Sequence, residues 1–151
     1  MPSQSTRGIT DAQFVVTANY NVGGAFTTTN AIDLGQAGAF PVSERVTVQI
    51  STTIATGANN KNVNIVLEHA NTNANASFKN CNIGPTADGT GSIPFPILAS
   101  LRDNNNTNVP AMTWNVSLPP DALQFIRLRA NVEGSGNPSA NNGTYTLKVL
   151  F

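Results

Sequence analysis

The sequence has one cysteine, Cys81, and one histidine, His69. A single cysteine cannot form a disulfide within the chain, so packing or neighbouring subunits must provide stability. Tetrahedral zinc sites use several cysteine or histidine ligands, which excludes a zinc site built by this chain alone. A thiol–histidine catalytic pair would need the fold to bring these two residues together by chance. We therefore interpret Cys81 as a small loop thiol and His69 as a strand-end histidine.

Charge is also scarce. Eight basic and eight acidic residues give a formal net charge of zero, and charged residues make up 11% of the chain, against roughly 25% in an average soluble domain. Neutral Asn, Thr, Ser and Gly must cover the surface, and weak repulsion between copies favours self-association. The lack of clustered Lys and Arg argues against a nucleic-acid partner.

Long apolar runs are missing. No stretch approaches the roughly 18 apolar residues of a membrane span, and the polar residues 1–8 lack the apolar core of a signal peptide. We expect no membrane partner and a soluble protein made in a reducing cytoplasm.

The acidic residues form no recognisable catalytic or metal-binding pattern. They are scattered at expected strand ends and turns, where solvated carboxylates are common, at Asp33, Glu44, Glu68, Asp88, Asp103, Asp121 and Glu133. Residues 103–108 alternate oxygen ligands as a calcium loop does, but Asn108 replaces the turn glycine and Trp114 replaces the closing glutamate. We predict no cofactor, no metal site and no enzymatic activity.

What the sequence does contain is alternation with a period of two. In residues 125–132, Ile126, Leu128, Ala130 and Val132 alternate with Phe125, Arg127, Arg129 and Asn131, which predicts a half-buried strand. Prolines precede this stretch and glycines follow it. Similar segments at 14–20, 45–54, 62–69, 111–118 and 143–151 predict further strands, and we expect 45–54 to pair with 62–69 through a turn at 57–60.

This pattern predicts an all-β fold. Short strands separated by turns over 151 residues favour one antiparallel jelly-roll β-sandwich of about eight strands, covering residues 13–151, after a flexible N-terminal arm at 1–12. An immunoglobulin-like sandwich is the alternative, which the absence of the Cys-Trp-Cys pattern disfavours.

Three groups of residues are candidates for a partner interface. Arg127 and Arg129 lie on one side of their predicted strand, either as a small anion or carboxylate site or as a solvated face paired with nearby acids. The arm and the proline-interrupted segment 93–98 offer unpaired backbone or apolar groups at an edge. The interface residues predicted in these two segments are Arg7, Ile9, Asp11, Ile93 and Phe95.

The order of short motifs resembles the jelly-roll capsid cement, or head decoration, proteins of tailed bacteriophages. The motifs are Ile9-Thr-Asp-Ala-Gln13, Asn30-Ala-Ile-Asp-Leu-Gly35, the strands with Val46 and Val63, Phe78, Leu118-Pro-Pro, Phe125-Ile-Arg-Leu-Arg129 and Tyr145-Thr-Leu147. The resemblance implies a non-enzymatic virion protein, synthesised in the bacterial host cytoplasm. It would bind the outer surface of the major capsid protein shell as a homodimer or homotrimer.

Two other functions remain open. A carbohydrate-binding jelly-roll module would need exposed aromatic side chains for sugar stacking, but Trp114 shares a predicted strand face with Met112, Val116 and Leu118, so we expect it to be buried. A major coat protein is disfavoured because no basic interior arm is present.

Overall fold

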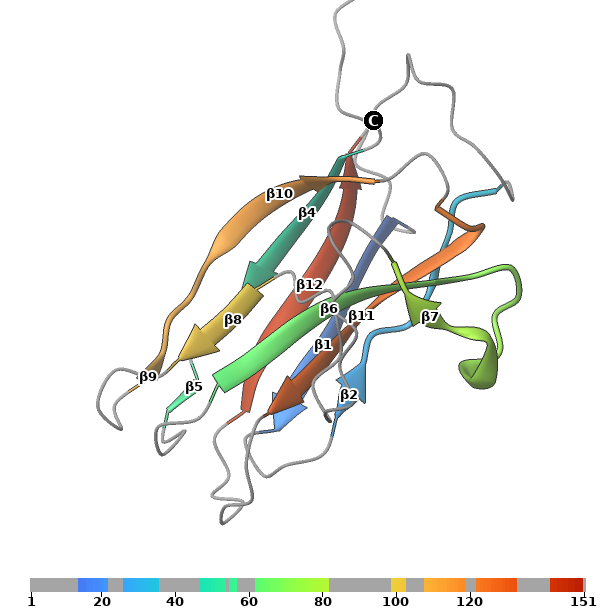
Figure 1. Ribbon diagram of the computed structural model, residues 1–151. Coiled ribbons are helices and arrows are strands. Elements are labelled where there is room, and N and C mark those ends of the chain that lie inside the picture. Colours follow the sequence, from blue (N-terminus) through green and yellow to red (C-terminus); the bar gives the residue numbers. More distant parts are fainter. Residues whose placement is uncertain are drawn as a thin grey trace, which may run out of the picture.

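The computed structural model describes residues 14–21, 26–35, 47–53, 55–56, 62–81, 99–102, 108–118, 122–132 and 142–150. These residues form two antiparallel sheets that pack face to face as a β-sandwich (Figure 1). The prediction of an all-β sandwich is confirmed. No helix among them is long and apolar enough to cross a membrane.

The first sheet has four strands. Their order is β1 (Val15–Asn21), β12 (Asn142–Leu150), β4 (Thr47–Thr52) and β10 (Thr113–Ser117). Strand β12 lies between β1 and β4, so the first and last described strands are direct neighbours.

The second sheet is built on two long strands, β11 (Phe125–Val132) and β6 (Asn62–Ala70). Strands β2 (Thr27–Thr28) and β3 (Ile32–Asp33) both pair with the edge of β11 that faces away from β6. Strands β7 (Lys79–Asn80) and β8 (Ala99–Arg102) pair with the edge of β6 that faces away from β11. A separate small pair joins β5 (Ala55–Thr56) and β9 (Asn108–Val109).

The chain crosses repeatedly between the two sheets. It passes from β1 to the β2–β3 edge, back to β4, across to β6 and its β7–β8 edge, back to β10, across to β11 and finally to β12. With β2–β3 and β7–β8 each taken as one interrupted edge strand, each of the two large sheets has four strand positions. This order of crossings is that of a jelly roll.

A one-residue bulge interrupts the edge formed by β2 and β3. Arg129 faces Thr28, but Phe125 faces Asp33, so the edge contains one residue more than β11 between these pairs. Thr29 lies at this step. Its backbone N–H donates to the Leu128 carbonyl at 3.0 Å, and its hydroxyl accepts the Leu128 N–H, also at 3.0 Å. The side chain of Thr29 therefore replaces the backbone acceptor that the bulge displaces.

The opposite edge carries a longer insertion. Glu68 faces Asn80 on β7, while Ile65 faces Ala99 on β8. An uninterrupted antiparallel strand would place the third residue after Asn80 opposite Ile65. The predicted interface segment at 93–98 belongs to this insertion and lies outside the described residues, as does the arm at 1–12.

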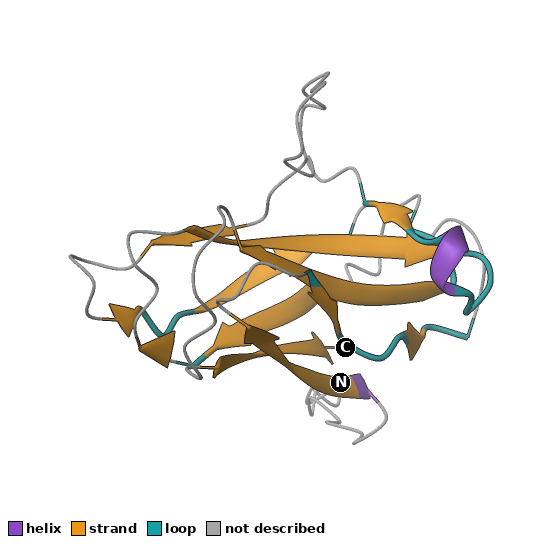
Figure 2. Ribbon diagram, turned by 90° about the horizontal axis from the view of Figure 1, so that it is seen from below, coloured by secondary structure: helices purple, strands orange, loops and turns teal. Residues whose placement is uncertain are grey.

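The core lies between the two layers of strands, which Figure 2 shows from below. Apolar side chains at alternate positions of the four central strands fill it, namely Val48, Ile50, Val63, Ile65, Leu67, Ile126, Leu128, Ala130, Tyr145, Leu147 and Val149. Full burial of an aliphatic or aromatic side chain stabilises the fold by about 1.5–3 kcal/mol. The core-facing sides predicted for residues 62–69 and 125–132 are thus confirmed. The strands are more than half-buried, however, because residues on their opposite side are also buried, namely Asn64, Val66, Glu68 and Arg127.

Two expectations were wrong in detail. Residues 45–54 and 62–69 do not form a hairpin, because β4 and β6 belong to opposite sheets and present their apolar sides to the same core. The face assigned to Met112, Trp114, Val116 and Leu118 is only partly buried. Leu118 is buried and Trp114 packs partly against the core, but Met112 is 47% exposed because it precedes β10 at the margin of the sheet.

Candidate functional site

The outer face of the second sheet carries a compact cluster of charge. Arg127 and Arg129 occupy alternate positions of β11, and Glu68 lies directly opposite Arg127 on β6. Because neighbouring strands lie about 4.8 Å apart, side chains at these positions can meet across the ladder. The alternation that sends Ile126 and Leu128 into the core therefore brings the charged residues together outside it.

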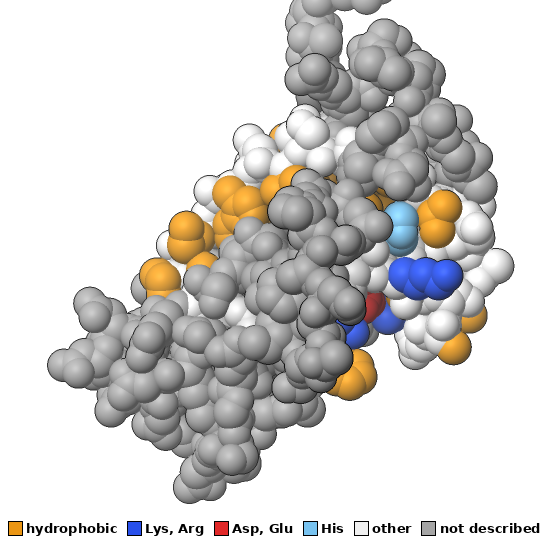
Figure 3. Space-filling view, viewed as in Figure 1, with side chains coloured by type: hydrophobic (Ala, Val, Ile, Leu, Met, Phe, Trp, Pro, Cys, Tyr) orange, Lys and Arg blue, Asp and Glu red, His pale blue; other side chains and the backbone are white. Residues whose placement is uncertain are grey.

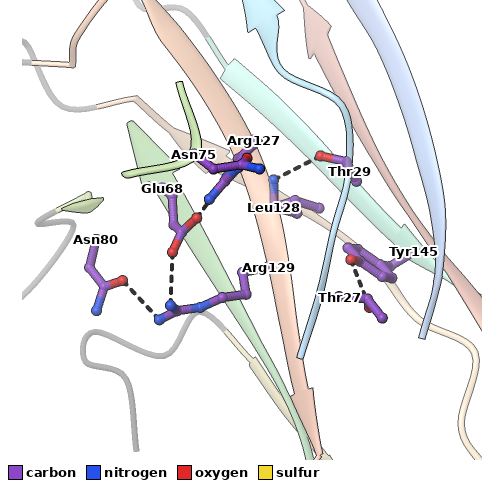
Figure 4. A network of polar contacts seen from close by, with 9 residues as sticks. All are labelled: Thr27, Thr29, Glu68, Asn75, Asn80, Arg127, Leu128, Arg129 and Tyr145. Carbon is purple, nitrogen blue, oxygen red and sulfur yellow. Dashed lines mark hydrogen bonds and ion pairs between the residues drawn. The ribbon is translucent and has the colours of Figure 1, made fainter. Parts of the chain in front are cut away.

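Glu68 is held between the two arginines (Figure 4). Its Oε2 accepts from Arg127 Nε at 2.8 Å, and its Oε1 lies 3.0 Å from Arg129 Nη1. Glu68 is 2% exposed and Arg127 is 8% exposed. The expectation that Glu68 is a solvated carboxylate was therefore wrong, because both of its oxygens are paired with arginines. This face was expected to be either an anion site or a solvated face paired with acids. The arginines are paired with an acid, but the face is largely buried.

Residues from the Asn-rich turn complete the cluster. The 3₁₀ turn Asn75–Ser77 places Asn75 Oδ1 at 2.7 Å from Arg127 Nη1, and Asn80 Oδ1 lies 3.2 Å from Arg129 Nη2. The Phe78 ring lies 3.8 Å from the Arg127 guanidinium carbon, a cation–π contact. Phe78 therefore holds the Asn-rich turn against Arg127 of β11.

These contacts fix the arginines in place. Burying a charge costs several kcal/mol unless it is paired and hydrogen-bonded, and Glu68 with the two asparagines provides such partners. One donor is left over. Arg129 Nε is buried and has no hydrogen-bond partner among the residues that the structure describes.

A pocket of about 290 Å³ opens beside the cluster. It is lined by Phe26, Thr28, Glu68, Asn75, Phe78, Arg127 and Arg129. Figure 3 shows basic, acidic and apolar side chains gathered on this part of the surface. Phe26 lies 5.9 Å from the Arg129 guanidinium carbon and is 65% exposed, so an aromatic ring stands at the pocket beside a cation. We call this feature the arginine pocket.

The arginine pocket is suited to holding a negatively charged group. Two guanidinium groups and one carboxylate leave an excess of one positive charge, and planar guanidinium groups bind carboxylates and phosphates with high geometric specificity. Both oxygens of Glu68 are already occupied by guanidinium groups. The arrangement is therefore suited to binding and orienting a charged group.

The structure brings together only two of the residues predicted for the interface, Arg127 and Arg129. Arg7, Ile9, Asp11, Ile93 and Phe95 lie outside the described residues. Glu68 was not predicted as a partner of the arginines, because residues 62–69 were expected to pair with residues 45–54. The outward position of Glu68 in an alternating strand was visible, but its neighbour on β11 was not. Nothing in the sequence singled out Phe26 or the two asparagines.

The other residues weighed as chemical candidates have structural places. Cys81 is a core residue, not a loop thiol, and its backbone N–H donates to the Leu67 carbonyl at 2.8 Å. His69 Nδ1 accepts the Leu123 N–H at 3.4 Å. Within the described ranges, no three His, Cys, Asp or Glu side chains are grouped so that they could hold a metal ion.

Apart from the charge cluster on the outer face, a polar contact lies between the two sheets. The Tyr145 hydroxyl is 3.0 Å from Thr27 Oγ1, which links β12 of the first sheet to β2 of the second. Tyr145 is fully buried, and this burial raises the pKa of its hydroxyl above the ordinary value of 10.0. The Tyr145 hydroxyl thus stays protonated to a higher pH in the folded protein than in the unfolded chain.

Comparison with known proteins leaves the chain without an assigned family. No protein-family model and no curated protein matches it. Among solved structures, PirA is similar over 92% of this chain and 95% of its own, with 12% identity and a TM-score of 0.40. The K1 cleaved adhesin domain of Lys-gingipain from Porphyromonas gingivalis W83 is similar over 96% of this chain and 92% of its own, with 11% identity and a TM-score of 0.38. Values this low assign no function, and the resemblance to capsid cement proteins stays a prediction.

Proposed function

We propose that this chain is a non-enzymatic structural protein of a bacteriophage head. It binds the outer surface of the major capsid protein shell as a homo-oligomer and reinforces the shell. The main support is the arginine pocket, whose charges are locked by ion pairs and hydrogen bonds on an otherwise weakly charged jelly roll. Such a site is suited to binding a negatively charged group at a fixed position on a partner surface.

The outer face of the first sheet supports the same proposal. A row of hydroxyl side chains crosses all four strands in register at Thr17, Thr146, Ser51 and Thr113. The pair at each end of this row is hydrogen-bonded, with 2.8 Å between the Thr17 and Thr146 hydroxyl oxygens and 3.1 Å between those of Thr113 and Ser51. A neutral hydroxyl surface adapts to a polar partner without the desolvation cost of charges.

An oligomer that contacts several shell subunits at once would bind the shell firmly even if each single interface is weak. An interface of standard size buries about 1,600 Å² in total. When an oligomer holds several such interfaces at once, avidity raises the overall affinity by roughly 10²–10⁴. The arm at 1–12 and the segment 93–98, with Arg7, Ile9, Asp11, Ile93 and Phe95, remain the predicted capsid-facing elements of this arrangement.

The test is a native mass measurement followed by co-sedimentation with empty, expanded heads from a phage encoding a matching capsid protein. We expect a discrete dimer or trimer that pellets with heads at a saturating ratio. A jelly-roll protein of similar size and net charge serves as the control for non-specific pelleting. A monomer that stays in the supernatant would overturn the proposal.

One observation favours a second candidate, a carbohydrate-binding module. Phe26 is an exposed aromatic ring beside the polar side chains of Asn75, Glu68 and Arg129, and sugar sites combine such a ring with hydrogen-bonding groups. A glycan array would test this function, with Phe26→Ala as the matched variant. Binding lost in that variant would favour the carbohydrate module, and an empty array would remove it.

A further inference from the structure

We infer that the arginine pocket is a receptor for a single carboxylate, an aspartate or glutamate side chain presented by the partner protein. The identification of that partner as the shell protein rests on the proposed function. The receptor chemistry rests on the pocket alone. Three features carry the inference: the charge balance, the unused donors and the size of the pocket.

The charge balance selects a monoanion. Arg127 and Arg129 contribute two positive charges and Glu68 one negative charge, and Glu68 lies 2.8 Å from Arg127 and 3.0 Å from Arg129. One further carboxylate neutralises the pocket. A doubly charged phosphate would over-compensate it, because the buried Glu68 carboxylate stands in the same cluster and repels added negative charge.

The donors needed for a carboxylate are present. Arg127 uses Nε for Glu68 and Nη1 for Asn75, and Arg129 uses Nη1 for Glu68 and Nη2 for Asn80. A guanidinium group carries more N–H donors than these contacts occupy. Because both groups are already fixed by neighbours, a ligand pays little of the usual side-chain ordering cost.

The size and lining of the pocket fit a side chain. Its 290 Å³ lies at the lower limit of the roughly 300–1,000 Å³ typical of small-molecule sites. Phe26 offers an exposed ring against which the methylene groups of an acidic side chain can pack, while the carboxylate reaches Arg129. The occupant is therefore one acidic side chain from a facing surface.

The experiment is an NMR titration of the full chain with a capped Gly-Glu-Gly peptide. The resonances followed are the Arg129 Nε–H and the Phe26 ring. Matched titrations use capped Gly-Gln-Gly and inorganic phosphate. We expect saturable shifts with the Glu peptide at a dissociation constant of about 1 mM, equivalent to about −4 kcal/mol, and much weaker or no binding of the other two probes. Equal binding of the Gln peptide, or tighter binding of phosphate, would overturn the inference.

Variants locate the binding. Arg129→Gln keeps the Arg127–Glu68 pair and removes the excess charge, so affinity for the Glu peptide should fall at least about tenfold. Phe26→Ala removes an exposed ring without touching the core and should weaken binding severalfold. Lys79→Gln removes an exposed charge from β7 that does not line the pocket, and it should bind as the wild type does. If Arg129→Gln and Phe26→Ala both bind normally, the pocket is not the receptor.

The same titration separates this inference from the proposed function. If the Glu peptide binds but heads are not bound, the carboxylate receptor stands and the capsid function falls. If heads are bound but the peptide is not, the capsid function stands and this pocket is not its receptor.

Discussion

At the scale of single residues, Glu68 is central to the stability of the charge cluster on the second sheet. It is the only carboxylate in contact with either arginine among the described residues, and it is nearly inaccessible to water. Breaking a buried ion pair from one side leaves uncompensated charge and costs far more than the pair contributes in net stability. The two partners must therefore be considered together.

We predict that Glu68→Gln lowers the free energy of unfolding by about 3–5 kcal/mol, because Arg127 is left buried without its counter-charge. Urea unfolding followed by circular dichroism measures the change. Asp33→Asn is the matched control, since Asp33 is an exposed carboxylate on the same sheet, and it should change stability by less than about 1 kcal/mol. A loss below 1 kcal/mol in Glu68→Gln would show that Glu68 and Arg127 do not form a buried ion pair.

Tyr145 gives a prediction about alkaline pH. Burial raises the pKa of its hydroxyl in the folded state, while the unfolded chain ionises near 10.0. The stability that Tyr145 contributes is thus fully present below pH 10 and is lost as pH rises through the folded-state pKa. We expect the midpoint of urea unfolding to fall above pH 10, and to fall less steeply in Tyr145→Phe. Identical alkaline profiles for the two proteins would contradict the assignment.

At the scale of elements, the edge strands carry the irregular features. The long central strands β6, β11 and β12 keep their register throughout, whereas β2–β3 contains a bulge and β7–β8 an insertion. Bulges and interruptions at sheet edges limit pairing with other chains. The bulge also lies next to the arginine pocket, because Phe26 and Thr28 come just before it in the chain and line the pocket.

The bulge depends on the Thr29 hydroxyl. We predict that Thr29→Val, which keeps the shape but removes the acceptor of the Leu128 N–H, costs about 1–3 kcal/mol of stability. Thr17→Val is the control, because the Thr17 hydroxyl bonds Thr146 at an exposed position, and it should change stability by no more than about 0.5 kcal/mol. Thermal unfolding of both variants measures the difference. Equal effects would mean that the bulge does not need the hydroxyl.

At the scale of the whole molecule, the pairing of β1 with β12 joins distant parts of the chain. Residues 15–21 pair with residues 142–148, and both strands contribute to the same face of the core. A fold dominated by such distant pairings forms only after long loops have closed, which is typical of slow-folding β-sandwiches. The arm at 1–12 lies outside the described residues, before β1 in the chain.

We predict that deleting residues 1–8 leaves the melting temperature within about 2 °C of the full chain, because no strand of the described sandwich is removed. Occupancy of phage heads should fall in the co-sedimentation assay if the arm contacts the shell. Differential scanning calorimetry and head occupancy are measured on the same preparation. Unchanged occupancy would remove the arm from the interface, and a large loss of stability would show that it belongs to the fold.

The sequence alone determined the long central strands and the sides that they turn to the core. Alternation in residues 62–69 and 125–132 decided which side chains enter the core, because the period of two is a local property of an extended backbone. It also placed Arg127 and Arg129 on one side of their strand.

Only the tertiary structure decided which strands are neighbours. Residues 45–54 and 62–69 are close in sequence and match a hairpin in pattern, yet they face each other across the core in different sheets. Glu68 therefore meets the two arginines instead of a residue of β4. The contact between Glu68 and Arg127 spans 59 positions, and a local pattern carries no information over that separation because strand pairing depends on how all the strands pack together.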